Sequence, residues 1–219
     1  MINISKETTE KLKSKLKGQI ILPSDLDYDQ VREIWNAMID RRPALIVRCA
    51  EADDVPQTTA FARENGLEIS IRGAGHNIAG NALCDNGVTI DFSTMRNVRD
   101  DAQKKRAYVE PGATLADFDE VAQSYGLATP VGINSTGIAG LTLGGGFGWL
   151  TRKYGMTVDN LISVEVVTAP SGVRIMTPSS IGFLRSRLLQ EREARCDNAS
   201  PPITPSHKCS EPPGCLLLQ

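Results

Sequence analysis

The stretch IRGAGHNIAG, residues 71–80, places one histidine among three glycines directly after a strand-like run. Gly73 and Gly75 permit positive φ, so successive backbone N–H groups can approach a diphosphate with no side chain between them. A nicotinamide-binding loop would have GxGxxG spacing, but Ile78 stands where the third glycine belongs. This spacing disfavours a nicotinamide-dependent dehydrogenase. Taken alone, the loop is equally consistent with an anion-binding backbone and with a plain structural turn.

The segments on either side of the loop predict a βαβ unit. Residues 44–48 and 67–72 are short strand-like runs, and residues 53–66 between them carry an Asp cap, a Pro in the first turn and a Gly stop. Such a unit is expected to be parallel and right-handed. The loop therefore begins at the carboxyl end of a strand, where open α/β sheets usually bind ligands. A further strand is expected at residues 88–92.

The N-terminal part, residues 1–38, is expected to be helical. Residues 6–17 predict an exposed helix that Gly18 ends. A second helix is expected to end before Pro43, since apolar residues recur at helical spacing on one stripe: Val31, Ile34, Trp35, Met38 and Ile39.

Downstream of the loop, residues 106–112 predict a strand that ends in a turn. Thr114 and Asp117 form a capping-box pattern at the start of a helix that Gly126 closes. Residues 161–176 predict a β-hairpin with a Pro-Ser-Gly turn. Residues 177–219 hold six of the 12 prolines and three of the five cysteines, and we expect them to form a loose tail.

A second glycine-rich stretch, STGIAGLTLGGGFGWLTRKYG, covers residues 135–155. A structural turn does not need so many glycines, whereas close approach of the backbone to a large planar ligand does. Packing of a helix against a sheet is the alternative. It is expected to explain some of these glycines but not the triplet at 144–146.

These motifs together resemble one known family. The sequence is similar to FAD-linked oxidases of the vanillyl-alcohol-oxidase and p-cresol-methylhydroxylase (PCMH) type, nearest to their berberine-bridge-enzyme-like bacterial members. The resemblance rests on IRGAGHNIAGNALCDNGVTIDFSTMRNV, VEPGATLADFDEVAQSYGLATPVGINSTG, GLTLGGGFGWLTRKYGMTVDNL and VEVVTA. It implies an α+β fold, with a PCMH-type FAD-binding domain over residues 39–176. Two α/β subdomains are implied, a small βαβ-based piece and a mainly antiparallel sheet with helices, with a boundary near residue 95.

The resemblance also implies where FAD binds. It assigns the pyrophosphate to Arg72, Gly73, Ala74, Gly75, His76, Asn77 and Ile78. It places further FAD contacts at Pro111, Gly112, Ala113, Ser135, Thr136, Gly137, Ala139, Gly140, Leu141, Thr142, Gly144, Gly145, Gly146, Gly148, Asp159 and Asn160, with the backbone near Val164 and Val166 beside the adenine. For Asp159 and Asn160, a capped turn is an equal alternative.

The resemblance gives His76 a specific role, the covalent attachment of the flavin through its 8α-methyl group. A neutral imidazole nitrogen is a nucleophile, which suits that role. The alternative for a lone histidine is a structural or surface position. Many relatives form a second flavin bond through a cysteine near the position of Ile133 or Asn134, and no cysteine stands there. We therefore expect no cysteinyl link.

Beyond Met176 the sequence departs from the family, which continues with a substrate domain that supplies the catalytic base. No residue is therefore assigned a catalytic role. One hypothesis is the FAD-binding domain of an oxidoreductase that oxidises an alcohol, sugar or amine-type carbon by hydride transfer to flavin, with dioxygen as acceptor. The other is a truncated, non-catalytic remnant that binds FAD weakly or not at all. A small-molecule substrate is expected only if a substrate domain is supplied.

Composition limits the other partners. A net charge of −2 and a pI near 5.8 give no electrostatic attraction to nucleic acid or anionic membranes. No apolar run approaches a membrane span and no targeting segment is recognised, so we expect a cytoplasmic protein with free thiols. Irregular spacing argues against a metal site in the tail at Cys196, His207, Cys209 and Cys215.

Overall fold

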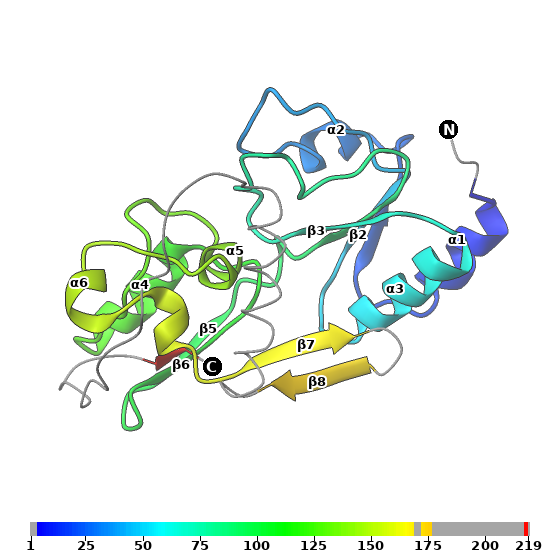
Figure 1. Ribbon diagram of the computed structural model, residues 1–219. Helices are drawn as coiled ribbons and strands as arrows, with labels where there is room; N and C mark the ends of the chain where they lie inside the picture. The colour runs from blue at the N-terminus through cyan, green and yellow to red at the C-terminus, as the bar shows by residue number, and fades with distance from the viewer. Residues whose placement is uncertain (1–3, 169–171, 177–216, 219) are drawn as a thin grey trace, which may run out of the picture.

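The computed structural model describes residues 4–168, 172–176 and 217–218. A four-stranded sheet forms its first part (Figure 1). The strand order is β1 (Gln19–Ile21), β2 (Leu45–Arg48), β4 (Val88–Asp91), β3 (Ile69–Arg72). Strands β2 and β3 both run parallel to β4, and β1 is antiparallel to β2. The three predicted strands and their parallel direction are confirmed. β4 lies between β2 and β3, so the two strands of the predicted βαβ unit are not neighbours.

The two central strands, β2 and β4, are buried on both faces, as is typical of parallel strands. Leu45 and Val47 face one apolar cluster with Phe61, whereas Ile46 faces another with Ile21. Helix α3 (Asp54–Glu64) is the predicted helix between β2 and β3, and it lies beside α1 (Lys6–Lys13) at one end of the molecule (Figure 1). Successive residues of β2 therefore anchor opposite layers.

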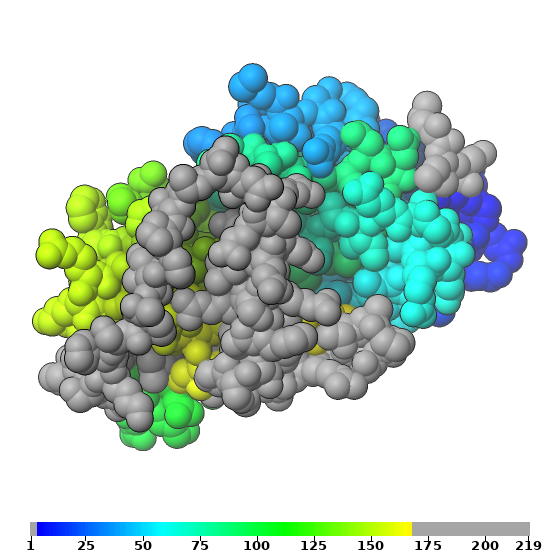
Figure 2. Space-filling model, in the orientation of Figure 1, coloured from blue at the N-terminus to red at the C-terminus, as the bar shows by residue number. Residues whose placement is uncertain are grey.

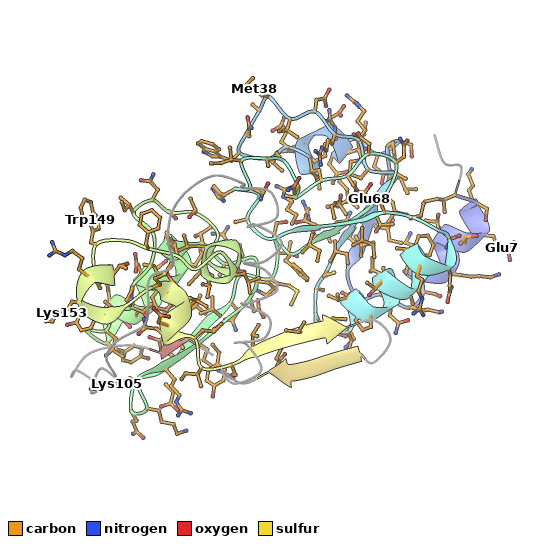
Figure 3. All side chains as sticks on the ribbon, in the orientation of Figure 1. Glu7, Met38, Glu68, Lys105, Trp149 and Lys153 are labelled. Atoms are coloured by element: carbon orange, nitrogen blue, oxygen red, sulfur yellow. The ribbon has the colours of Figure 1, made fainter. Side chains whose placement is uncertain are left out.

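The predicted second N-terminal helix is wrong in its extent. Helix α2 covers only Tyr28–Val31, and Trp35 and Met38 are 68% and 91% exposed. The backbone N–H of Trp35 donates to the Gly75 carbonyl at 3.1 Å, so the chain leaves helical geometry to contact the glycine loop. Met38 lies at the outer surface (Figure 3). Tertiary hydrogen bonds thus override the helical periodicity of this segment.

A second sheet joins β5 (Val98–Asp101) antiparallel to β6 (Arg106–Val109), and β9 (Leu217–Leu218) pairs parallel with β6. The predicted helix α4 (Leu115–Ser124) buries Phe118 against this sheet. The capping box is confirmed, because the Thr114 side chain accepts from the Asp117 N–H while the Asp117 carboxylate accepts from the Thr114 N–H.

Short elements complete the fold. They are α5 (Ile138–Leu143), α6 (Thr151–Tyr154), the 3₁₀ helix η1 (Thr157–Asn160) and the antiparallel pair β7 (Val164–Thr168) and β8 (Gly172–Met176). This hairpin confirms its prediction, and Val167 of β7 packs against the core of the first sheet.

The space-filling view shows α3 in cyan and the α5–α6 segment in yellow-green at opposite ends of one face (Figure 2). Except for the strand Leu217–Leu218, the expected loose tail lies outside the described residues.

Candidate functional site

The glycine loop begins where β3 ends at Arg72. Gly75 and Gly80 have φ of +76° and +75°, a region that residues with a Cβ rarely adopt. A Cβ on Gly80 would lie 2.7 Å from a side-chain carbon of Ile39, and the Asn36 side chain donates to the Ile78 carbonyl at 2.8 Å. The segment after α2 therefore supports the loop from one side.

Two further segments approach the loop from the other side. A Cβ on Gly73 would lie 2.9 Å from the Pro111 carbonyl oxygen, and one on Gly137 would lie 2.9 Å from the Ala74 Cβ. The structure thus brings together the loop at 73–75, the turn at 111–113 and the start of the second glycine stretch. These segments are far apart in sequence, and their backbones meet with almost no side chains between them.

The same junction is tied by hydrogen bonds between the turn and the second stretch. The Leu115 N–H donates to the Thr136 carbonyl at 2.9 Å, and the Ile138 N–H donates to the Ala113 carbonyl at 3.0 Å. The exposed Ser135 hydroxyl accepts from the Ala116 N–H at 3.2 Å. These backbone hydrogen bonds consequently fix the start of helix α4 to the start of helix α5.

The later glycines of the second stretch have internal packing partners. A Cβ on Gly145 would lie 2.6 Å from Met156 Cε, and one on Gly146 would lie 2.2 Å from Thr157 Oγ1. On Gly148 it would lie 1.8 Å from the Val131 carbonyl oxygen. Close packing on Met156 and Thr157 at the start of η1 therefore accounts for two of the three glycines of the triplet, although it is not the packing of a helix against a sheet. Gly140 is different, because nothing lies within 4 Å of its Cβ position.

Among the described residues, two nitrogen atoms at the loop are buried and have no hydrogen-bond partner. They are Nδ1 of the half-buried His76 and Nε of Arg72. Another Arg72 nitrogen donates to the Val31 carbonyl, and burial lowers the pKa of the guanidinium group. Buried polar atoms are normally paired, so these two atoms fit a polar ligand at the loop.

Asp159 and Asn160 form a turn with their own surroundings. Asp159 accepts from the Met156 N–H at 2.8 Å, and the buried Asn160 side chain donates to the Tyr154 and Met156 carbonyls at 3.1 and 2.9 Å. These contacts are those of the capped-turn alternative. Val164 and Val166 lie on β7, opposite β8. Contact of any of these residues with FAD stays a prediction.

Sequence reasoning missed two ion pairs that Asp91 forms close to the glycine loop. Asp91, the last residue of β4, is fully buried and lies between Arg48 and Arg72. The signal was available, because an aspartate that ends an otherwise apolar strand is rarely buried without a partner. The partner could not be identified without the sheet order.

Comparison with known proteins identifies the family. The protein-family model described as the FAD binding domain matches residues 43–177 of this chain. The chain belongs to this family. Its fold is that of the PCMH-type FAD-binding domains of oxidases, and its homologues are FAD-linked oxidoreductases.

Among curated relatives of this FAD binding domain, (R)-6-hydroxynicotine oxidase of Paenarthrobacter nicotinovorans is 38% identical over 159 residues, which is 72% of this chain and 35% of the relative. The uncharacterized FAD-linked oxidoreductase YgaK of Bacillus subtilis is 40% identical over 158 residues, again 72% and 35%. The chain therefore spans about a third of the length of these relatives.

Solved structures give the same family. The crystal structure of 6-hydroxy-D-nicotine oxidase from Arthrobacter nicotinovorans superposes with a TM-score of 0.73 at 37% identity, covering 75% of this chain and 36% of that one. Berberine-bridge-enzyme-like 1 of Physcomitrella patens gives 0.75 at 25% identity, with 81% and 39% covered.

Within the described part of this FAD binding domain, no helix is long and apolar enough to cross a membrane, and no group of three or more His, Cys, Asp or Glu residues could hold a metal ion. Cys49 and Cys84 are free and buried, and burial raises the pKa of the Cys49 thiol to about 12. The other three cysteines lie outside the described residues.

Proposed function

We propose that this FAD binding domain serves an oxidoreductase that oxidises an alcohol, sugar or amine-type carbon and passes the electrons to dioxygen, with His76 as the covalent tether of the cofactor. The observation that carries the proposal is the junction of Gly73, Ala74 and Gly137, where two glycine segments meet beside His76. The family match identifies the cofactor as FAD.

The loop residues would hold the diphosphate. Backbone N–H groups of the Gly73–Gly75 segment carry partial positive charge, which favours an anion. The Arg72 guanidinium adds a full positive charge directly under Gly75, since its Nε lies 3.3 Å from the Cβ position of that glycine. An anion bound there would contact a fixed backbone rather than mobile side chains.

His76 would hold the isoalloxazine ring. Its Nδ1 atom is shielded from solvent and has no hydrogen-bond partner among residues 4–168, 172–176 and 217–218, so a bond at this atom would break no hydrogen bond to them. A covalent tether would keep the ring in place by removing dissociation as a competing process. The flavin, when bound, supplies the capacity to accept a hydride from carbon.

The substrate side of the reaction is not assigned to residues of this chain. A small molecule would be bound, and a base supplied, only where a substrate domain joins this one. The competing proposal is a non-catalytic remnant that binds FAD weakly or not at all. Apolar residues of the second half are exposed, among them Phe147 at 70% and Trp149 at 82%, and Figure 3 shows Trp149 at the outer surface. Large exposed apolar side chains are typical of a surface that another domain covers.

Acid denaturation of the purified, FAD-saturated protein tests the proposal. Yellow colour that stays with the precipitated polypeptide, and a peptide mass increased by the flavin at His76, are expected. The matched control is His76→Ala, which should release all colour into the supernatant. A wild-type protein that never acquires flavin absorbance would contradict FAD binding and favour the remnant. Colour that is bound but released by acid would contradict only the tether.

A further inference from the structure

Three charged residues lie at one level of the first sheet, where its parallel strands end. In the strand registers, Arg48 of β2 and Arg72 of β3 are both paired with Asp91 of the central strand β4. Directly paired residues project from the same face of a sheet. The carboxylate is therefore placed between two guanidinium groups that come from different βα segments.

The carboxylate of Asp91 is held from several directions. It is fully buried, and its Oδ2 accepts from Arg48 Nε at 3.3 Å and from the Ser93 hydroxyl at 2.9 Å. Its Oδ1 accepts from the Ser93 N–H at 2.9 Å and lies 3.9 Å from Arg72 Nε. The last distance is that of an ion pair without a hydrogen bond. Asp91 thus attracts Arg72 without satisfying its Nε donor.

The charges of Arg48, Asp91 and Arg72 do not balance. Two guanidinium groups face one carboxylate, so one positive charge is left over beneath the glycine loop. The Arg72 side chain is only 15% exposed, and its Nε has no hydrogen-bond partner in the part of the chain that the structure describes. A buried and uncompensated charge destabilises a fold unless an opposite charge arrives. An anion on the loop would meet that requirement.

We propose that Asp91 is a positioning residue for the diphosphate of FAD. It holds the Arg72 guanidinium under Gly75, so that the surplus positive charge acts at the same place as the N–H groups of the loop. Arg48 shares the carboxylate but contributes indirectly, by keeping it fixed. The inference rests on the proposed function, because it presupposes that FAD binds at this loop.

The test measures FAD affinity in the His76→Ala background, where binding is reversible, by titration of flavin fluorescence. Asp91→Asn keeps the shape of the side chain and removes its charge. Electrostatics alone would tighten the binding of an anion after loss of a negative charge. The positioning role predicts the opposite, an increase in Kd of about tenfold.

A double-mutant cycle decides whether the effect passes through Arg72. In an Arg72→Gln background, Asp91→Asn should change Kd by less than about twofold, since the group to be positioned is gone. In the matched Arg48→Gln background, the loss should remain near tenfold. Equal losses in both backgrounds, or tighter binding in the Asp91→Asn variant, would overturn the inference.

Urea unfolding of each variant separates positioning from folding. If Asp91→Asn does not fold, Ser93→Ala removes only one donor to the carboxylate. It should raise Kd by about twofold to threefold, and this change should also disappear in the Arg72→Gln background. If neither the wild-type protein nor the His76→Ala parent binds FAD, the proposed function itself is contradicted. A parent that binds FAD, with no change on Asp91→Asn or Ser93→Ala, overturns only the role of Asp91.

Discussion

The two glycine-rich segments of this chain look alike in sequence and differ in what surrounds them. Beside residues 73–75, two buried side-chain nitrogen atoms have no hydrogen-bond partner among the described residues, whereas at residues 145–148 the glycines pack against Met156, Thr157 and Val131. The first segment has the buried, unpaired polar atoms that a ligand loop is expected to have. The second is built to let the chain approach itself closely. Glycine content alone therefore does not distinguish a ligand loop from a packing motif.

The largest expected effect lies in the second segment. Gly148→Ala would place a Cβ 1.8 Å from the Val131 carbonyl oxygen, a contact that a rigid backbone cannot relieve. We expect a loss of about 3 kcal/mol or more in the free energy of unfolding, measured with urea.

Gly140→Ala is the matched control for Gly148→Ala. It meets nothing within 4 Å and lies inside helix α5. It should stabilise the protein by about 0.5 to 1 kcal/mol through helix propensity. Equal effects of the two substitutions would break the distinction between packed and open glycines.

A smaller effect is expected where the two segments meet. Gly137→Ala would place a Cβ 2.9 Å from Ala74 Cβ, and should lower the free energy of unfolding by about 1 to 2 kcal/mol while weakening FAD binding about tenfold. Both losses should shrink in the double variant Ala74→Gly/Gly137→Ala, because Ala74→Gly removes the carbon atom that the new Cβ would meet. If the double variant restores neither stability nor FAD binding, the close contact between Ala74 and Gly137 is contradicted.

The smallest effect concerns the cap that ties the second segment to α4. Burial raises the pKa of the Asp117 carboxyl, but hydrogen bonds from Arg96 and Thr114 outweigh it and leave the pKa below its usual 3.8. Because the folded-state pKa is depressed, the stabilisation is present above the unfolded-state pKa and is lost as pH falls through the folded-state value. Asp117→Asn should therefore lower the free energy of unfolding by about 1 kcal/mol at neutral pH, with the difference vanishing in acid.

Asp119, in the same helix, is the matched control of opposite sign. Burial raises the pKa of its carboxyl. At pH values above its folded-state pKa, Asp119→Asn should be neutral or stabilising, and any gain should fade as pH drops below the unfolded-state pKa. Urea unfolding at a series of pH values measures both variants. Parallel pH profiles for the two variants would contradict the assigned causes.

Local patterns were sufficient where neighbours in sequence decide the structure. The strand at Val88–Asp91, the helix that begins at Leu115 and the pairing of Val164–Thr168 with Gly172–Met176 follow from apolar runs, a capping box and a turn signal. The motif resemblance likewise identified the family that the comparisons confirm. The helix prediction failed for the segment after α2, because hydrogen bonds to Gly75 and Ile78, about forty positions downstream, outweigh the helical periodicity of its apolar residues.

The sequence by itself determined the family, the main elements and the loop in which His76 stands, because these depend on short-range order and motif spacing. Only the tertiary structure decided that Arg48, Asp91 and Arg72 form one row, since sheet order and register join residues that no local pattern connects. It also decided which glycines face open space and which face the chain. Both outcomes depend on where distant backbones meet, and packing sets that distance.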